Sequence, residues 1–139
     1  MIKNMHVYLV TNGDGQEAIK FYQSAIDAEL LSLQTFADLP NRAEMGIAED
    51  EKDRVLNAHL RVGQTDFMLS DTMPGQSYQL GDQVTVAIIS SDIASTERIF
   101  GNLAQDGKVV MPLQEVFWSP SYGQVTDKFG VTWQISTHE

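Results

Sequence analysis

Residues that could take part in acid-base chemistry occur at alternate positions of two short apolar segments. The segment "MHVYLV" contains His6 and Tyr8, and the segment "LNAHLRV" contains His59 and Arg61. Imidazole gains and loses a proton near neutral pH, and a guanidinium binds carboxylate or carbonyl oxygens. The sequence therefore offers His6 and His59 as candidate catalytic acids or bases, with Arg61 orienting an anionic or carbonyl substrate.

Other polar motifs are interpreted as structural. The loop "TNGDGQ" follows a predicted strand and opens a predicted helix, but it lacks the glycine spacing of a dinucleotide-binding loop, so we interpret it as a turn in which Asp14 caps the helix. Asp71 and Asp127 stand next to predicted turns and are expected to shape them. The chain contains no cysteine, which excludes disulfides, thiolate ligands and cysteine nucleophiles.

The composition is that of a soluble globular protein, since 42% of the 139 residues are apolar and 20% are charged. Nineteen acidic residues against nine basic ones give a net charge of -10, which repels phosphate backbones and anionic membrane surfaces. We therefore expect neither nucleic acid nor a membrane as a partner. No apolar segment has the length of a signal core or a membrane span, and together with the absence of cysteine this predicts a cytoplasmic location.

The hydrophobic patterning predicts two successive units, each consisting of a strand, a helix and three further strands. In the first half the predicted elements are a strand at 5–10, a helix at 14–27, a strand at 28–36, and a hairpin of strands at 55–63 and 65–71. The polar segment 37–54 is predicted to be a loop, which could contain a helical turn. In the second half they are a strand at 84–90, a helix at 91–107, and strands at 108–117, 122–127 and 131–137.

A residue-by-residue comparison of the two halves indicates an internal duplication. With a shift of 79 positions "HVYLV" falls on "TVAII" and Asp27 falls on Asp106, while a shift of 66 places "DFMLS" on "TWQIS". We therefore predict a single duplicated domain over residues 1–139, with module 1 at about 1–72, a linker at about 72–82 and module 2 at about 83–139.

In each predicted strand the apolar side chains of one face, such as Met5 and Val7, suit the side covered by a helix. The other face is mixed in polarity, which is typical of a small-molecule pocket, although a half-solvated sheet also has one polar face. Its residues include His6, Tyr8, His59, Arg61, Met68 and Gln134. Phe117, Trp118 and Tyr122 surround a predicted Ser-Pro turn, where they could cover a pocket mouth or pack in a dimer interface.

Three strings of the sequence are similar to those of a known superfamily. They are "AIKFYQSAIDAELL", "HLRVGQTDFMLSD" and "LAQDGKVVMPLQEVFWSPSYGQVTDKFGVTWQIS". Together they resemble the vicinal oxygen chelate (glyoxalase/bleomycin resistance/dioxygenase) superfamily and its PhnB-like branch, whose members are often labelled 3-demethylubiquinone-9 3-methyltransferase. The resemblance implies an α+β fold of two βαβββ modules, with curved antiparallel or mixed sheets forming an open barrel, paired in a dimer.

In metalloenzymes of this superfamily the ligands lie on the first and last strands of each module, which the resemblance carries to His6, Met68, Thr85 and Gln134. His6 is a good ligand and the amide of Gln134 is a neutral oxygen donor, whereas Met68 and Thr85 do not suit a zinc-like ion. His59 could add a ligand, but no carboxylate completes the set. We therefore predict no metal and no cofactor, with His6, His59 and Gln134 as weak candidate ligands for a divalent ion.

We predict a homodimer that binds a small molecule and has no assigned activity. Its expected ligand-binding residues are His6, Tyr8, His59, Arg61, Met68, Phe117, Trp118, Tyr122 and Gln134. One alternative is a metal-dependent glyoxalase or dioxygenase-type enzyme that uses His6, His59 and Gln134. Another is a ligand-sequestering resistance protein, or a dimeric scaffold without catalysis. The sequence leaves open whether the protein is an enzyme.

Overall fold

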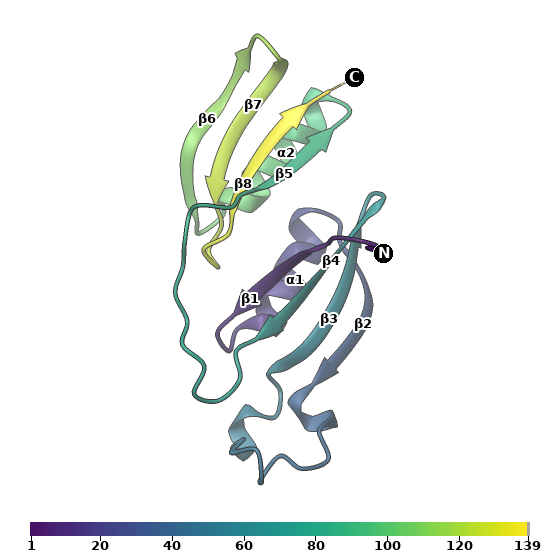
Figure 1. Cartoon of the computed structure of the whole chain (residues 1–139). Helices are drawn as coiled ribbons and strands as arrows, with labels where there is room; N and C mark the ends of the chain where they lie inside the picture. The colour runs from purple at the N-terminus through teal and green to yellow at the C-terminus, as the bar shows by residue number, and fades with distance from the viewer. Residues whose placement is uncertain (139) are drawn as a thin grey trace. The chain divides into compact units, whose positions relative to one another are not determined.

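The computed structural model describes residues 1–138, and the chain divides into two compact units, Met1–Gln79 and Leu80–Glu139. We call these units module 1 and module 2. Each contains one four-stranded sheet and one α-helix (Figure 1). Among the described residues, neither α-helix has the length or the apolar composition that crossing a membrane requires.

Module 1 has a mixed sheet. Its elements are β1 (Val7–Thr11), α1 (Gly15–Ala25), β2 (Glu29–Thr35), the 3-10 turns η1 (Phe36–Asp38) and η2 (Glu49–Glu51), β3 (Val55–Val62) and β4 (Thr65–Asp71). The strand order is β1-β4-β3-β2, in which β1 is parallel to β4 and the other neighbours are antiparallel. The polar segment between β2 and β3 forms no strand, as predicted.

Module 2 repeats this arrangement. Its elements are β5 (Val86–Ser90), α2 (Ile93–Ala104), β6 (Lys108–Val116), β7 (Ser119–Thr126) and β8 (Thr132–Thr137). The strand order is β5-β8-β7-β6, and β5 is parallel to β8. The predicted fold of two βαβββ modules with mixed sheets is therefore confirmed. The sheets are not closed, and the pairing of two chains in a dimer stays a prediction.

The duplication extends to the conformation of the backbone. The shift of 79 positions carries β1 onto β5 and Asp27 onto Asp106. Among the described residues, these two aspartates are the non-glycine positions with positive φ, at 55° and 58°. Each follows the helix of its module, where a left-handed residue helps the chain to leave the helix, and aspartate tolerates this conformation better than most residues.

The predicted alternation between a core face and a polar face is confirmed in the middle strands. Leu60 and Leu69 are fully buried, and Ile135 takes the same role in module 2. Tyr22 of α1 packs edge to face on Phe67, with ring centroids 6.0 Å apart. Burial of each such side chain stabilises the fold by about 1.5–3 kcal/mol. The core therefore lies between each helix and its sheet and leaves the opposite sheet face for other roles.

The prediction that Met5 and Val7 pack under the helix is wrong. Met5 is 95% exposed and Val7 is 39% exposed, because β1 begins only at Val7 and the preceding residues lie outside the sheet. Leu9 is the buried apolar residue of β1. Alternation along the strand then places Tyr8 on the opposite face, as expected.

Asp71 organises the turn between β1 and α1, which confirms its predicted structural role. The buried carboxylate accepts hydrogen bonds from Thr11 Oγ1 at 2.8 Å and from the backbone N–H groups of Gly13, Gly15 and Val55 at 2.7, 3.0 and 2.8 Å. Asp14 stands at the N-cap position, but its side chain does not cap the helix as predicted. Asp71 satisfies the first helical N–H group instead, from a distant strand.

Asp127 has the equivalent role in the turn before β8. Its buried carboxylate accepts hydrogen bonds from the backbone N–H groups of Phe129 and Val131 at 2.9 and 3.1 Å, and from Trp133 Nε1 at 2.8 Å. Gly130 lies in the same turn with φ at 91°, a conformation that favours glycine. The interpretation of Asp127 as a turn-forming residue is therefore confirmed.

The predicted Ser-Pro turn is wrong. β7 begins at Ser119, so Pro120 lies within the strand, and Phe117 and Trp118 form the two-residue turn after β6. The buried Ser119 hydroxyl donates to the carbonyl oxygen of Thr137 at 2.9 Å and accepts from its N–H group at 3.1 Å. These hydrogen bonds hold Ser119 in the sheet, so β7 begins earlier in the chain than Pro120 suggested.

Candidate functional site

The face of the module 1 sheet that points away from α1 brings together several of the predicted site residues. Across β3 and β4, His59 pairs with Met68 and Arg61 pairs with Asp66. Tyr8 of β1 pairs with Met68 from the other side, so Met68 lies between Tyr8 and His59 on the central strand. Side chains that are paired in this way lie about 4.5–5.5 Å apart at Cβ.

Asp66 joins the neighbouring side chains into one cluster. Its Oδ1 accepts a hydrogen bond from Arg61 Nε at 2.7 Å, and its Oδ2 accepts from Arg61 Nη2 at 3.3 Å and from His59 Nε2 at 2.9 Å. The hydrogen bonds from Arg61 and His59 lower the pKa of Asp66 from 3.8 to about 2. The bond to Asp66 also raises the pKa of Arg61. The carboxylate is therefore ionised throughout the neutral range.

The ionised carboxylate fixes the tautomer of His59. Because a carboxylate only accepts hydrogen bonds, the proton of the neutral imidazole must lie on Nε2, which leaves Nδ1 with a lone pair. This Nδ1 has no hydrogen bond to any residue in 1–138, and the side chain is 33% exposed. His6 Nδ1 lies 3.2 Å from the backbone oxygen of Asp66, so it is the protonated nitrogen and Nε2 carries the lone pair.

The two imidazole rings lie close together, with centroids 6.3 Å apart and planes at 61°. We call Asp66, Arg61, His59 and His6 the Asp66 cluster. It offers two basic nitrogens beside one guanidinium. Tyr8 borders the same face, where its hydroxyl accepts a hydrogen bond from Asn57 Nδ2 at 3.2 Å.

The corresponding face of module 2 carries a network of neutral groups. Gln134 Nε2 donates to Thr85 Oγ1 at 2.9 Å, while its oxygen accepts from the Tyr122 hydroxyl at 2.6 Å. Gln124 Nε2 donates to the same hydroxyl at 2.9 Å. Tyr122 is buried, and its hydroxyl links Gln124 and Gln134 in this network. The nitrogen and the oxygen of the Gln134 amide therefore both have hydrogen-bond partners within the module.

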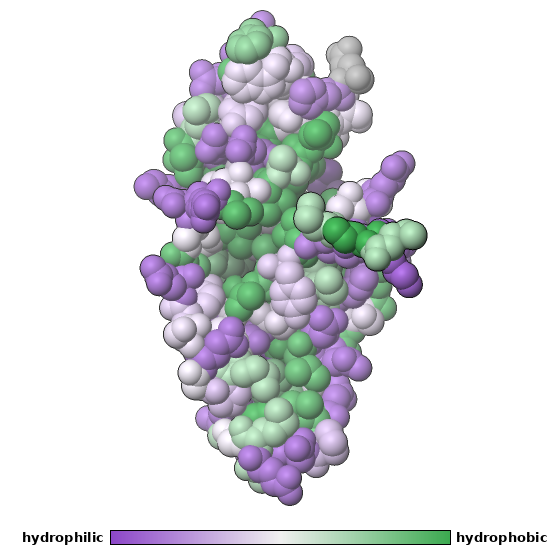
Figure 2. All heavy atoms as spheres, viewed as in Figure 1, coloured by the Kyte–Doolittle hydropathy of each residue, from purple (hydrophilic) through white to green (hydrophobic). Residues whose placement is uncertain are grey.

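Three aromatic rings continue this face toward the β6–β7 turn. The Phe117 and Trp118 centroids are 4.8 Å apart, and those of Trp118 and Tyr122 are 5.3 Å apart, both in edge-to-face geometry. Phe117 is 97% exposed and Trp118 is 49% exposed, and Figure 2 shows hydrophobic residues reaching the surface among hydrophilic ones. Trp118 therefore presents aromatic surface at the edge of module 2, with Tyr122 fixing its position.

The two modules differ chemically at equivalent positions. Arg61 pairs with Asp66 in module 1, and Thr126 pairs with Thr132 at the corresponding position of module 2. The two threonine hydroxyls share a hydrogen bond of 2.8 Å. The pair of His59 and Met68 likewise corresponds to the pair of Gln124 and Gln134. The βαβββ fold therefore forms without an ionic cluster at this place.

The nine predicted ligand-binding residues fall on both modules. Module 1 carries His6, Tyr8, His59, Arg61 and Met68, and module 2 carries Phe117, Trp118, Tyr122 and Gln134. The sequence analysis left Asp66 out of the predicted site and found no carboxylate to complete it. The sequence feature that could have revealed the role of Asp66 was the short turn around Gly63. This turn sets the register of the hairpin and so places Arg61 opposite Asp66.

The positions that the sequence resemblance implied as metal ligands do not together fit a metal ion. Met68 offers a thioether, Thr85 a hydroxyl that is bonded to Gln134, and Gln134 an oxygen that already accepts from Tyr122. The His59 nitrogen that faces Asp66 is also engaged. Within residues 1–138, no group of three or more His, Cys, Asp or Glu side chains is placed to hold a metal ion.

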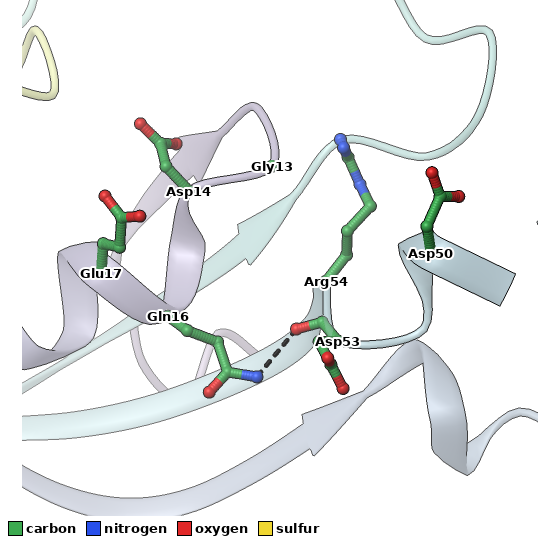
Figure 3. Close-up of a pocket in the computed structure, with 7 residues that line it drawn as sticks. All are labelled: Gly13, Asp14, Gln16, Glu17, Asp50, Asp53 and Arg54. Atoms are coloured by element: carbon green, nitrogen blue, oxygen red, sulfur yellow. Dashed lines mark hydrogen bonds between the residues drawn. The ribbon is translucent and has the colours of Figure 1, made fainter. Parts of the chain in front are cut away.

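An open pocket of about 450 Å³ lies at the start of α1, and none of the predicted site residues lines it. Its lining consists of Gly13, Asp14, Gln16, Glu17, Asp50, Asp53 and Arg54. Figure 3 shows Asp14 and Glu17 on the helix side and Asp50 on the opposite side. Gln16 Nε2 donates to the backbone oxygen of Asp53 at 2.8 Å. Four carboxylates against one guanidinium disfavour an anionic ligand in this pocket.

Comparison with known proteins gives a consistent family. The family model described as 3-demethylubiquinone-9 3-methyltransferase matches residues 3–136. Protein YjdN of Escherichia coli K12 is 36% identical over 137 residues, which cover 93% of this chain and 91% of that protein. The crystal structure of protein PA1353 from Pseudomonas aeruginosa is 32% identical with a TM-score of 0.86, covering 99% of this chain and 98% of that one.

More distant structures show the fold alone. The PhnB protein from Bacillus cereus is 23% identical with a TM-score of 0.81, covering 98% of this chain and all of that one. A glyoxylase/bleomycin resistance protein/dioxygenase domain from Frankia sp. EAN1pec is 14% identical with a TM-score of 0.69, covering all of this chain and 99% of that one. The chain therefore belongs to the 3-demethylubiquinone-9 3-methyltransferase family, and these more distant structures share its fold.

Proposed function

We propose that this protein binds a small anionic or carbonyl-containing molecule at the Asp66 cluster of module 1. Tyr8 and Met68 line the same sheet face in this proposal. The guanidinium of Arg61 binds a carboxylate or carbonyl oxygen of the ligand, and the histidine lone pairs accept hydrogen bonds from it. On module 2, Phe117 and Trp118 present an uncharged aromatic surface for a ligand in this proposal, while Tyr122 and Gln134 support it through their hydrogen bond.

The observation that carries the proposal is the chemical difference between the modules. An exposed ion pair contributes about 0–1 kcal/mol to stability, and module 2 reaches the same fold with threonines and glutamines at the equivalent positions. Folding therefore gives little reason to keep an arginine, an aspartate and a histidine linked on a sheet face. Preorganised polar groups of this kind are typical of ligand sites.

The family description does not assign a methyl-transfer activity to this chain. The loop "TNGDGQ" forms the turn that Asp71 organises, and nothing in its hydrogen bonding identifies it as a cofactor site. The metal-dependent alternative has little support, because Gln134 and the Asp66 side of His59 are already hydrogen-bonded. Sequestration of a ligand without catalysis is compatible with the same binding site.

A thermal-shift screen tests the proposal. The panel contains 2-oxo acids, α-oxo-aldehydes, quinones and planar drugs, and a true ligand raises the melting temperature as its concentration increases. We expect 2-oxo acids to stabilise the protein, and we expect Arg61→Ala to abolish the response. Lys20→Ala, which removes an exposed positive charge from α1, is the matched control and should retain it. An unchanged response in Arg61→Ala would refute the site, and no response to any compound would favour a scaffold.

A further inference from the structure

We infer that the Asp66 cluster abstracts a proton from the carbon next to the carbonyl of a short 2-oxo acid, with His59 Nδ1 as the base and without a metal ion. The inference rests on the proposed function, because it assigns a substrate class and a reaction to the same site. It also gives Asp66 a role that sequence reasoning did not assign.

The unused hydrogen-bonding groups of the cluster define the substrate class. Arg61 uses Nε and Nη2 for Asp66, which leaves both Nη1 hydrogens for a ligand. His59 leaves one lone pair at Nδ1. The two residues are two positions apart on β3, so their Cα atoms are about 7 Å apart and their side chains share a face. A small molecule with a carboxylate at one end and an acidic C–H bond close by complements this arrangement.

The proton transfer balances within the cluster. The C–H bond breaks, its electron pair moves into the enolate, and the negative charge develops on the carbonyl oxygen near the guanidinium of Arg61. The proton goes to His59 Nδ1, and the resulting imidazolium is stabilised by the ionised Asp66 at Nε2. Return of a proton from solvent to the same carbon regenerates the 2-oxo acid. The net reaction is exchange of carbon-bound hydrogen with water, which needs no oxidant or cofactor.

Asp66 is a positioning residue in this scheme, because it touches His59 and Arg61 and does not touch the substrate. It selects the Nε2–H tautomer of His59 and holds both side chains toward one face. A purely structural role for Asp66 would affect stability and leave the tautomer of His59 unchanged. The nitrogen-15 chemical shifts of the His59 ring distinguish these roles, since Asp66→Ala should lose the pure Nε2–H signature.

The test is hydrogen–deuterium exchange of the methyl group of pyruvate, followed by proton NMR in D₂O with EDTA present. We expect exchange about 100-fold faster than with imidazole at the same concentration, since a positioned base contributes about 10²–10⁴-fold. His59→Ala should reduce the rate to the imidazole background, and Asp66→Ala should reduce it about tenfold or more. His138→Ala removes an exposed histidine outside the cluster and should leave the rate unchanged.

The outcomes separate this inference from the proposed function. Pyruvate that binds in an Arg61-dependent way but does not exchange would overturn His59 as a base and leave the binding site in place. Exchange that persists in His59→Ala, or that EDTA abolishes, would overturn the inference as well. If pyruvate causes neither exchange nor a thermal shift and no other compound of the panel binds, both the inference and the proposed function fail.

Discussion

Asp66 is the residue that holds the candidate site together, because its carboxylate links Arg61 and His59 across two strands. Its folded-state pKa of about 2 lies below the ordinary value of 3.8, so the unfolded chain binds this proton more readily. The stabilisation by the ionised group is therefore complete well above pH 3.8 and disappears as the pH falls through about 2. At neutral pH the ionised carboxylate of Asp66 therefore keeps its hydrogen bonds to Arg61 and His59.

We therefore predict that the effect of Asp66→Asn on stability depends on pH. Urea unfolding should show the variant to be less stable than the wild type at pH 6, and the difference should shrink as the pH falls from 3.8 through about 2, where the wild-type carboxylate is half protonated. Asp82→Asn removes an exposed carboxylate outside the Asp66 cluster, and it serves as the control. A difference between wild type and Asp66→Asn that stays constant over this range would contradict the geometry of the cluster.

At the element scale the turn between β1 and α1 depends on one buried carboxylate. Asp71→Ala removes the acceptor of three backbone N–H groups and one hydroxyl, and it leaves buried donors without partners. We expect a loss of about 3–5 kcal/mol in the free energy of unfolding, measured by urea titration. Asp53→Ala, which removes an exposed side chain nearby, should change it by less than about 0.5 kcal/mol. Equal effects of the two substitutions would show that Asp71 does not hold the turn.

Replacing a glycine by alanine should have opposite effects on stability at two positions of module 2. A Cβ on Gly107 would clash with the backbone oxygen of Thr126, so Gly107→Ala should destabilise the protein. Gly101 lies within α2 with open space around it, so Gly101→Ala should raise the free energy of unfolding by about 0.5–1 kcal/mol through helix propensity. Thermal unfolding of both variants measures the two effects. Destabilisation by Gly101→Ala, or tolerance of Gly107→Ala, would contradict the packing described here.

The element scale also shows how far the sequence could predict the structure. The strands at Val55–Val62 and Thr65–Asp71 were predicted within one residue, because both are short apolar segments with partial alternation and a Gly-Gln turn separates them. The start of β7 was not predicted correctly, because Pro120 suggested a turn. The hydrogen bonds that hold Ser119 in the strand join it to Thr137, which is distant in sequence. Local patterns cannot show such contacts.

The candidate site was predictable to a similar extent. Alternation correctly placed His59, Arg61 and Met68 on one face, because strand period alone decides the face. The central role of Asp66 depends on the register of the hairpin, which places it opposite Arg61. The helix cap was missed for the same reason, since Asp71 reaches α1 from another strand. Sequence reasoning therefore found the faces, and the pairing of strands decided which side chains interact.

At the scale of the whole molecule we predict a homodimer. Large apolar side chains are exposed on the chain, among them Ile89 at 67% and Val110 at 50%, and association would remove such surface from water. Sedimentation equilibrium should give a mass twice the 15.5 kDa of one chain. Val110→Asp introduces a charge into the exposed apolar surface at this residue, and it should shift the monomer–dimer equilibrium toward the monomer. A monomer at all micromolar concentrations would contradict the prediction.

The central claim, binding of a small 2-oxo acid at the Asp66 cluster, is tested most directly by NMR titration of nitrogen-15-labelled protein with pyruvate. We expect saturable chemical-shift changes for the backbone amides of His59, Arg61 and Asp66, and we expect Arg61→Ala to abolish them. No change at these amides up to millimolar pyruvate, or changes confined to residues outside the sheet face of module 1, would contradict the account.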